Sequence, residues 1–219
     1  DPDYMHRLLL FLSLLPLLAA LVLRKLNADR VLRHSRNTRL HSRAEDLAEK
    51  MLASMGQEEV EIRTTKRVWA GASVTGEGWL ALPEQAADGD TAADHGRIAL
   101  RVGLYLTMQR NPAAIARRRW ALRFGHVFPV FTLVVCVFGL VVGRLPGLWA
   151  LSIVMASFGL AACAQLITVA TELQSAALAT VILEKKRILP RLSDEQAVVA
   201  ATRAWAWHGI VPGLLSRLM

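Results

Sequence analysis

The sequence contains few of the residues on which several protein classes depend. Only two of its 219 residues are cysteines, Cys136 and Cys163, and both fall inside apolar stretches. Such cysteines are more typical of buried free thiols than of a disulfide framework. Aromatic residues make up 6% and charged residues 20% of the chain, against 53% hydrophobic residues. The apolar excess is therefore aliphatic and gathered in blocks, which indicates membrane spans.

Sequence motifs of several functional classes are also missing. No segment repeats with a period of about 20 to 50 residues, which excludes a repeat architecture. The glycine-rich stretch 71–78 lacks the Lys-Ser/Thr pair of a P-loop, and no Ser/His/Asp arrangement is recognisable. The net charge is +8, but no DNA- or RNA-binding module accompanies it. We therefore expect no nucleic-acid partner and assign the positive charge to the surface of a lipid bilayer.

The first apolar block, residues 8–23, is short for a membrane span but sufficient with its flanking residues. Its length and the small Ala19–Ala20 pair also fit a signal peptide. However, an acidic flank precedes the block and a strongly basic flank follows it, which is the reverse of a secretory signal. We therefore expect an uncleaved anchor over residues 5–26, with its N-terminus outside the cytoplasm.

Two longer apolar blocks, residues 124–143 and 148–170, are joined by the turn sequence RLPG. Each block is long enough to cross a bilayer, so together they predict a transmembrane hairpin that extends over residues 124–188. Arginines precede the hairpin at 117–119, and Lys-Lys-Arg follows it at 185–187. This charge places both ends of the hairpin in the cytoplasm and the protein in a bacterial inner membrane.

The end of the chain predicts one more helix, over residues 193–219. Ser193 and Gln196 form a capping signal at its start. Arg203 disfavours a lipid-exposed span, whereas tryptophans suit an interface or a packed helix. We expect a fourth, partly shielded membrane-associated helix, which gives the chain three to four membrane helices.

The segment 27–123 lies between the anchor and the hairpin. A capping box at Ser42 and Glu45 predicts the start of an amphipathic helix. Glycine-separated apolar stretches predict two or three short strands within 58–82, and a further helix is expected over 91–109. The chain is therefore expected to be a mainly α membrane protein, with an anchor helix, a small α+β cytoplasmic domain, a transmembrane hairpin and a closing helix.

Two stretches give the chain a resemblance to a known family. Residues 92–101 read AADHGRIALR and residues 165–176 read QLITVATELQSA. In bacterial membrane metallopeptidases of the YugP-like neutral zinc family, the corresponding stretches are AAHEVGHAIQ and QLVTLPVEFDAS. The order of predicted elements over residues 8–218 is also similar, so the chain resembles this family over nearly its whole length.

The resemblance implies a former zinc site in which four residues occupy the family's functional positions. Asp94 and Ile98 stand where the family has two histidines, His95 stands at the catalytic glutamate, and Glu172 matches the distal carboxylate. H-E-x-x-H binds zinc because residues four apart project to one side of a helix. Ile98 has no ligand atom, and His95 points about 100° around the helix from Asp94. We predict a degenerate site with no metal and no catalytic residue, in which Arg97 or His95 pairs with Glu172.

The protein is then expected to be a catalytically inactive accessory or structural subunit of a larger membrane complex. Its partners would be lipid and other integral membrane subunits, and the small-residue stretches 155–164 and 203–209 are candidate contacts. One alternative is an active zinc endopeptidase with atypical ligands that include Glu172. The other is a pigment- or heme-carrying subunit of a photosynthetic or electron-transfer complex, with bacteriochlorophyll or heme on His208 or heme shared between His126 and His208. A His208 bonded to a carbonyl or water is the simpler interpretation.

Overall fold

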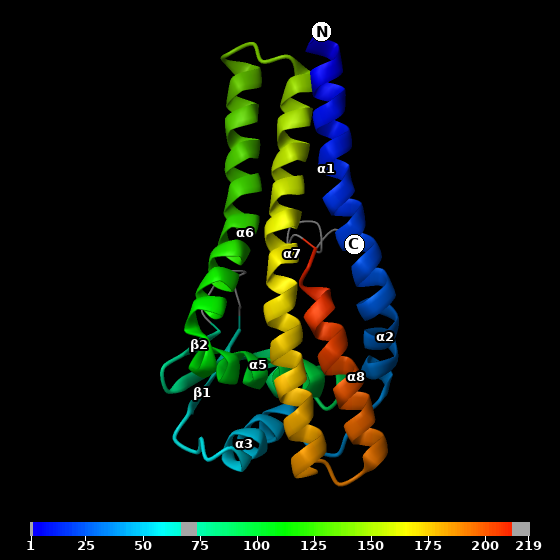
Figure 1. The fold of residues 1–219 in the computed structure, drawn as a ribbon, viewed down its shortest axis with the longest axis vertical. Coiled ribbons are helices and arrows are strands. Elements are labelled where there is room, and N and C mark those ends of the chain that lie inside the picture. The colour runs from blue at the N-terminus through cyan, green and yellow to red at the C-terminus, as the bar shows by residue number, and fades with distance from the viewer. Residues whose placement is uncertain (1, 67–73, 212–219) are drawn as a thin grey trace.

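The computed structural model describes residues 2–66 and 74–211 and is mainly helical (Figure 1). The chain begins with a continuous helical rod that contains one π-helical turn, and further helices and three short strands follow. The rod consists of α1 (Pro2–Arg24), the π-helical turn η1 (Lys25–Asp29) and α2 (Arg30–Asn37). The other helices are α3 (Ala44–Ser54), α4 (Glu84–Ala87), α5 (Ala92–Arg110), α6 (Pro112–Val141), α7 (Gly147–Lys186) and α8 (Leu192–His208).

Three of these helices are long and apolar enough to cross a membrane, namely Arg7–Asn37, Pro112–Val141 and Gly147–Lys186. In Figure 1 they form a row in which α7 lies between α1 and α6. The turn between α6 and α7 lies at the same end of the molecule as the N-terminus (Figure 1). The predicted mainly α fold, with helices long and apolar enough to cross a membrane and a helical hairpin of α6 and α7, is therefore confirmed.

The closing helix α8 differs from its prediction. It begins at Leu192 with Arg191 as its N-cap, so the capping signal at Ser193 is wrong, and Ser193 Oγ instead donates to Asp194 Oδ1 over 3.3 Å. The helix has 17 residues and packs against α5 and α7 at the polar end of the molecule. Among the described residues it is not one of the helices able to span a membrane. Residues 212–219 of the predicted fourth span lie outside the described residues.

The N-cap of helix α3 also differs from its prediction and lies one residue later in the chain. Arg43 is the N-cap, and its backbone N–H donates to Asp46 Oδ2 over 3.3 Å, so the capping box at Ser42 and Glu45 is wrong. The helix ends where Gly56 adopts a φ of +68°. Glycine reaches this left-handed conformation without steric cost, and the turn there satisfies the last carbonyls of the helix.

The predicted strands form one small sheet beside α5. Strand β1 (Glu61–Thr65) pairs in parallel with β3 (Trp79–Pro83), and β2 (Thr75–Gly76) pairs antiparallel on the other side of β3. Three short strands within the predicted stretch are therefore confirmed, and residues 67–73 lie outside the described residues. The central strand β3 carries Leu80 and Leu82, which are completely buried.

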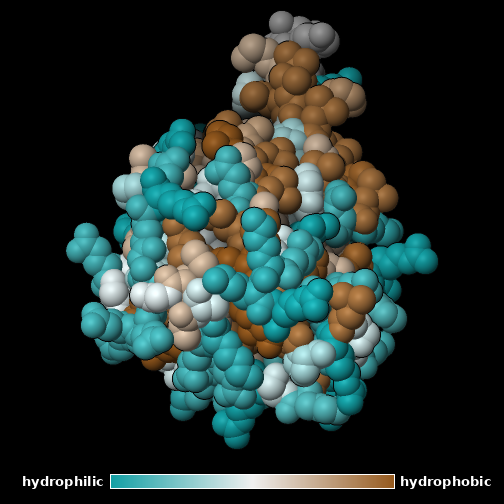
Figure 2. All heavy atoms as spheres, turned by 60° about the horizontal axis from the view of Figure 1, so that its bottom comes forward, coloured by the Kyte–Doolittle hydropathy of each residue, from teal (hydrophilic) through white to brown (hydrophobic). Residues whose placement is uncertain are grey.

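The largest hydrophobic core joins parts of the chain that are far apart in sequence. It combines residues of α3, β3 and α5 with residues from the end of α7 and from α8. Helix α5 runs across α7 (Figure 1), and at Gly103 a Cβ atom would lie only 2.1 Å from the carbonyl oxygen of Ser175. Figure 2 views the molecule from this end, where hydrophilic side chains cover the surface and the apolar helices rise behind it.

Most small residues of the two stretches expected to contact a partner are buried between helices of the chain itself. On α7, Ser157, Gly159 and Ala161 are buried, and a Cβ on Gly159 would lie 2.9 Å from Ser13 of α1. On α8, Ala204 and Ala206 are buried as well. Small residues let helix backbones approach closely. The prediction that these stretches are exposed is therefore wrong for their small residues, whereas contact of the stretches with a partner stays a prediction.

Candidate functional site

The start of α5 holds the first of the predicted metal-site positions. Thr91 is the N-cap, and its side chain accepts a hydrogen bond from the backbone N–H of Asp94 over 3.2 Å. The Thr91 hydroxyl in turn donates to Asp94 Oδ2 over 2.6 Å. A carboxylate in the first turn is also stabilised by the positive end of the helix dipole. Asp94 therefore serves the cap of its own helix.

His95 is completely buried and is held by two neighbours. Its Nδ1 lies 2.9 Å from the carbonyl oxygen of Thr91, and its Nε2 lies 3.3 Å from Ser42 Oγ. A carbonyl only accepts, so Nδ1 carries the proton and Nε2 accepts from the Ser42 hydroxyl. Burial lowers the pKa of His95, partly offset by the bond to Thr91. The imidazole is neutral near pH 7 and occupied at both nitrogens.

Ile98 stands at the position of the second histidine of the family pattern. Its side chain is completely buried and belongs to the largest hydrophobic core. It contributes packing there and has no atom that can bind a metal. Of the two positions that would carry the paired histidines, Asp94 therefore belongs to the helix cap and Ile98 to the apolar core.

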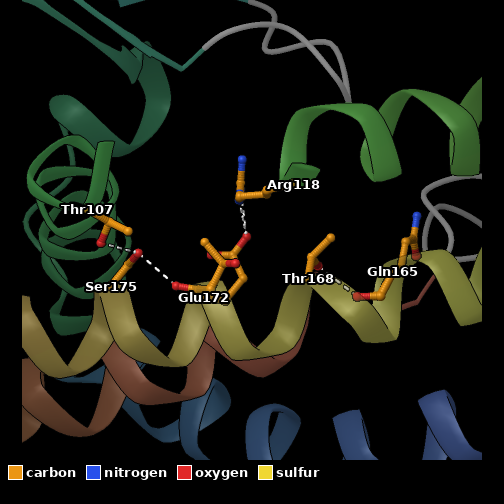
Figure 3. Close-up of polar contacts among 7 residues, drawn as sticks. Thr107, Arg118, Gln165, Thr168, Glu172 and Ser175 are labelled. Atoms are coloured by element: carbon orange, nitrogen blue, oxygen red, sulfur yellow. Dashed lines mark hydrogen bonds and ion pairs between the residues drawn. The ribbon is translucent and has the colours of Figure 1, made fainter. Parts of the chain in front are cut away.

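Glu172, the fourth predicted position, is bound by an arginine that the sequence did not single out (Figure 3). Arg118 Nε and Nη2 both lie 2.6 Å from Glu172 Oε1, and only 11% of the Arg118 side chain and 9% of the Glu172 side chain are exposed. The second carboxylate oxygen, Oε2, is buried without a partner among the described protein atoms. The predicted pairing of Glu172 with Arg97 or His95 is therefore wrong.

A second arginine lies in the electrostatic neighbourhood of this ion pair. The pKa of Arg101 is lowered to about 9, chiefly by burial, then by the positive charges of Arg118 and Arg97, while Glu172 acts in the opposite direction. Its Nη1 is buried without a partner among the described protein atoms. Two guanidinium groups and one carboxylate therefore lie near one another at the junction of α5, α6 and α7, and only Arg118 contacts the carboxylate.

Hydroxyl groups continue the polar contacts along α7 (Figure 3). Thr107 Oγ1 and Ser175 Oγ lie 2.8 Å apart, and each also lies 2.8 Å from a carbonyl oxygen of its own helix. Only two hydroxyl protons serve these three contacts, so one proton is shared between two acceptors. This contact links α5 to α7 where the two helices cross, next to Glu172.

Arg97 and His208 both contact Trp205. The Arg97 guanidinium lies 5.0 Å from the ring centroid of Trp205, which is the geometry of a cation–π contact. This contact explains why Arg97 does not reach Glu172. The His208 ring lies 4.7 Å from the Trp205 ring, and burial and the charge of Arg24 lower the pKa of His208 to about 4. His126 lies on α6, so the two candidate heme ligands stand on opposite sides of α7 (Figure 1).

The structure therefore brings together only some of the predicted positions. Asp94, His95 and Ile98 share one helix, whereas Glu172 lies in a separate ion pair on α7. Over residues 2–66 and 74–211, no group of three or more His, Cys, Asp and Glu side chains is arranged to hold a metal ion. In comparisons with known proteins, no family model, no curated protein and no solved structure matches the chain.

Proposed function

We propose that the protein is a catalytically inactive, metallopeptidase-like integral membrane protein that serves as an accessory or structural subunit of a larger membrane complex. The observation that carries the proposal is the Arg118–Glu172 ion pair. Glu172 matches the distal metal ligand of the resembled family, and here a guanidinium already supplies its positive partner. The positive charge of Arg118 at Oε1 supports a structural role for this carboxylate and disfavours a metal ion beside it.

The contacts of α5 support the same proposal. Asp94 completes the helix cap, His95 is bonded at both nitrogens, and Ile98 fills the apolar core. A zinc peptidase needs convergent ligands and a base that can deprotonate the metal-bound water. Each of the three positions has a structural task in place of that chemistry.

The arrangement of the spans supports a role as a subunit. Because α1 and α6 pack on opposite sides of α7, the spans form an open row whose edge helix α6 is covered on one side only (Figure 1). Phe131, Val134 and Phe138 on α6 are 64%, 62% and 67% exposed. The rings of Trp120, Phe124 and Phe128 stack along the same helix. Large exposed aromatic side chains are a frequent feature of the contact surfaces between proteins.

The charge distribution supports a location in the bacterial inner membrane with the N-terminus outside. Arginines and lysines flank the polar ends of the three spans, at 24–25, 117–119 and 185–187. Positive residues are retained on the cytoplasmic side of membrane proteins. On this proposal, the hydrophilic end seen in Figure 2 faces the cytoplasm.

Site-specific photo-crosslinking tests the role as a subunit. A benzoyl-phenylalanine is placed at Phe131 or Phe138 on α6, and at Phe11 on α1 as the control, since Phe11 is 66% exposed on the opposite edge of the row. We expect both α6 positions to yield one protein adduct of the same mass and Phe11 to yield none. Lipid adducts alone at the α6 positions, or equal protein adducts at Phe11, would contradict a specific subunit contact.

A further inference from the structure

A cavity of about 300 Å³ lies between the N-terminal helical rod and the end of α8, away from the ion pair of Glu172. It combines residues from the end of α1, from η1, from α2 and from α8. Six side chains line it, namely Arg24, Asp29, Leu32, Arg33, Arg36 and His208. None of these residues belongs to the Glu172 ion pair or to the former metal-site positions on α5.

The π-helical turn η1 brings the charged residues of the cavity together. Residues five apart on an α-helix point roughly 140° away from each other. Across the π-turn, however, Arg24 Nε lies 3.2 Å from Asp29 Oδ1. Arg33 and Arg36 follow Asp29 at intervals of four and three, which places them on the same face of α2. Such π-turns occur frequently at functional sites.

The cavity carries a surplus of positive charge. Three arginines face one aspartate, and His208 contributes no charge near pH 7 because its pKa is lowered to about 4. Arg33 and Arg36 are exposed, so they stand at the rim. A concave cationic surface of this kind attracts anions.

Arg24 forms the floor of the cavity. Its side chain is only 13% exposed, and its Nη1 is buried without a hydrogen-bond partner among the described protein atoms. Asp29 accepts from the Nε of the same guanidinium and leaves the buried Nη1 without a hydrogen bond. Guanidinium groups match phosphate in charge and in hydrogen-bond geometry.

The cavity lies where the apolar part of α1 ends, since Arg24 directly follows the apolar block 8–23. The phosphates of lipid headgroups lie at this level of a bilayer. We propose that the cavity binds a phosphate group, supplied by an anionic lipid headgroup or by soluble phosphate, with Arg24 at its floor and Arg33 and Arg36 at its rim.

Two probes distinguish the sources of the phosphate group. Full-length protein is reconstituted in vesicles of phosphatidylcholine and phosphatidylglycerol in equal amounts, and the lipids that remain bound after detergent extraction are counted by native mass spectrometry. Inorganic phosphate is titrated into the detergent-purified protein by calorimetry. The variants are Arg24→Gln and Arg36→Gln, and the matched control is Arg30→Gln, which removes an exposed arginine of α2 outside the cavity.

We expect both cavity variants to retain about ten-fold less phosphatidylglycerol than the wild type, since charge-assisted hydrogen bonds are lost, and Arg30→Gln to retain as much. Loss of calorimetric phosphate binding in the same variants would support the soluble source instead. The exposed Arg36 keeps the test valid if Arg24→Gln fails to fold. The proposal is overturned if neither probe binds the wild type, or if Arg30→Gln loses as much as Arg36→Gln.

Discussion

The interior between α5, α6 and α7 contains two arginines, Arg101 and Arg118, and one glutamate, Glu172. Because the positive charges outnumber the negative one, the three side chains differ in how much each contributes to stability. Arg118 forms an ion pair with Glu172, whereas Arg101 interacts with this glutamate only by longer-range electrostatic attraction. Removing one partner of a buried ion pair leaves an uncompensated charge, which costs more than the pair itself contributes. Which partner is removed therefore matters.

Glu172→Gln leaves both arginines without a carboxylate, and we expect a loss of about 3–5 kcal/mol in the free energy of unfolding. Arg118→Met leaves Glu172 within the field of Arg101, so its loss should be smaller. Denaturant unfolding in detergent measures both. The control is Arg63→Met, which breaks the exposed pair with Glu61 and should change the free energy of unfolding far less than Glu172→Gln does. A Glu172→Gln variant as stable as this control would contradict the assigned role of the pair.

His208 makes stability depend on pH. Its pKa is lowered from 6.5 to about 4 in the folded protein, so the unfolded chain binds the proton more tightly. The free energy of unfolding should be highest above pH 6.5 and fall by up to about 3 kcal/mol as the pH drops toward 4. His208→Asn removes this contribution and leaves all carboxylates in place. Equal pH slopes for the wild type and this variant would show that His208 is not held neutral.

At the scale of elements, the crossing of α5 over α7 positions the ion pair. The crossing depends on Gly103, where the backbone of α7 takes the space of a side chain. The Thr107–Ser175 hydrogen bond lies one turn further along α5 and fixes the register of the two helices. Any side chain at position 103 has to push the helices apart.

Gly103→Ala tests this close approach. A Cβ atom there would lie 2.1 Å from the backbone oxygen of Ser175, which a rotamer change cannot relieve. We expect a loss of about 2 kcal/mol or more in the free energy of unfolding. Gly209→Ala is the control, because its Cβ would meet nothing within 4 Å and its φ is −76°. Equal stability of the two variants would contradict the close approach.

The elements differ in how far the sequence alone predicts them. The hairpin of α6 and α7 follows from local signals, namely two apolar lengths and a Pro-Gly turn, and is confirmed. The caps predicted at Ser42 and Ser193 are wrong because the N-caps are Arg43 and Arg191, and arginine is not among the residue types that signal an N-cap. Capping signals therefore locate a helix start only to within one or two residues.

The partner of Glu172 could not be predicted because the two residues are 54 positions apart and belong to different helices. A signal exists, however, in the spacing of α6. Its buried residues Ile115, Ala121 and Gly125 mark one face, and Arg118 falls in the same series at intervals of three and four. The sequence does not single out Arg118 because the arginines at 117–119 are assigned together to the surface of the lipid bilayer.

At the scale of the whole molecule, the protein combines a row of three apolar helices with a polar end built around α5. The core of that end includes the last turns of α7, so the polar end and the spans share one continuous helix. The proposed function requires that the polar end binds no catalytic metal ion and that its charged residues have structural roles.

Zinc content tests this central claim most directly. The full-length protein is purified without chelator, equilibrated with zinc and, after removal of free metal, measured by elemental mass spectrometry. The account predicts no stoichiometric zinc in the wild type and no change in Glu172→Gln or Asp94→Asn. One tightly held zinc per chain that either substitution removes would contradict it.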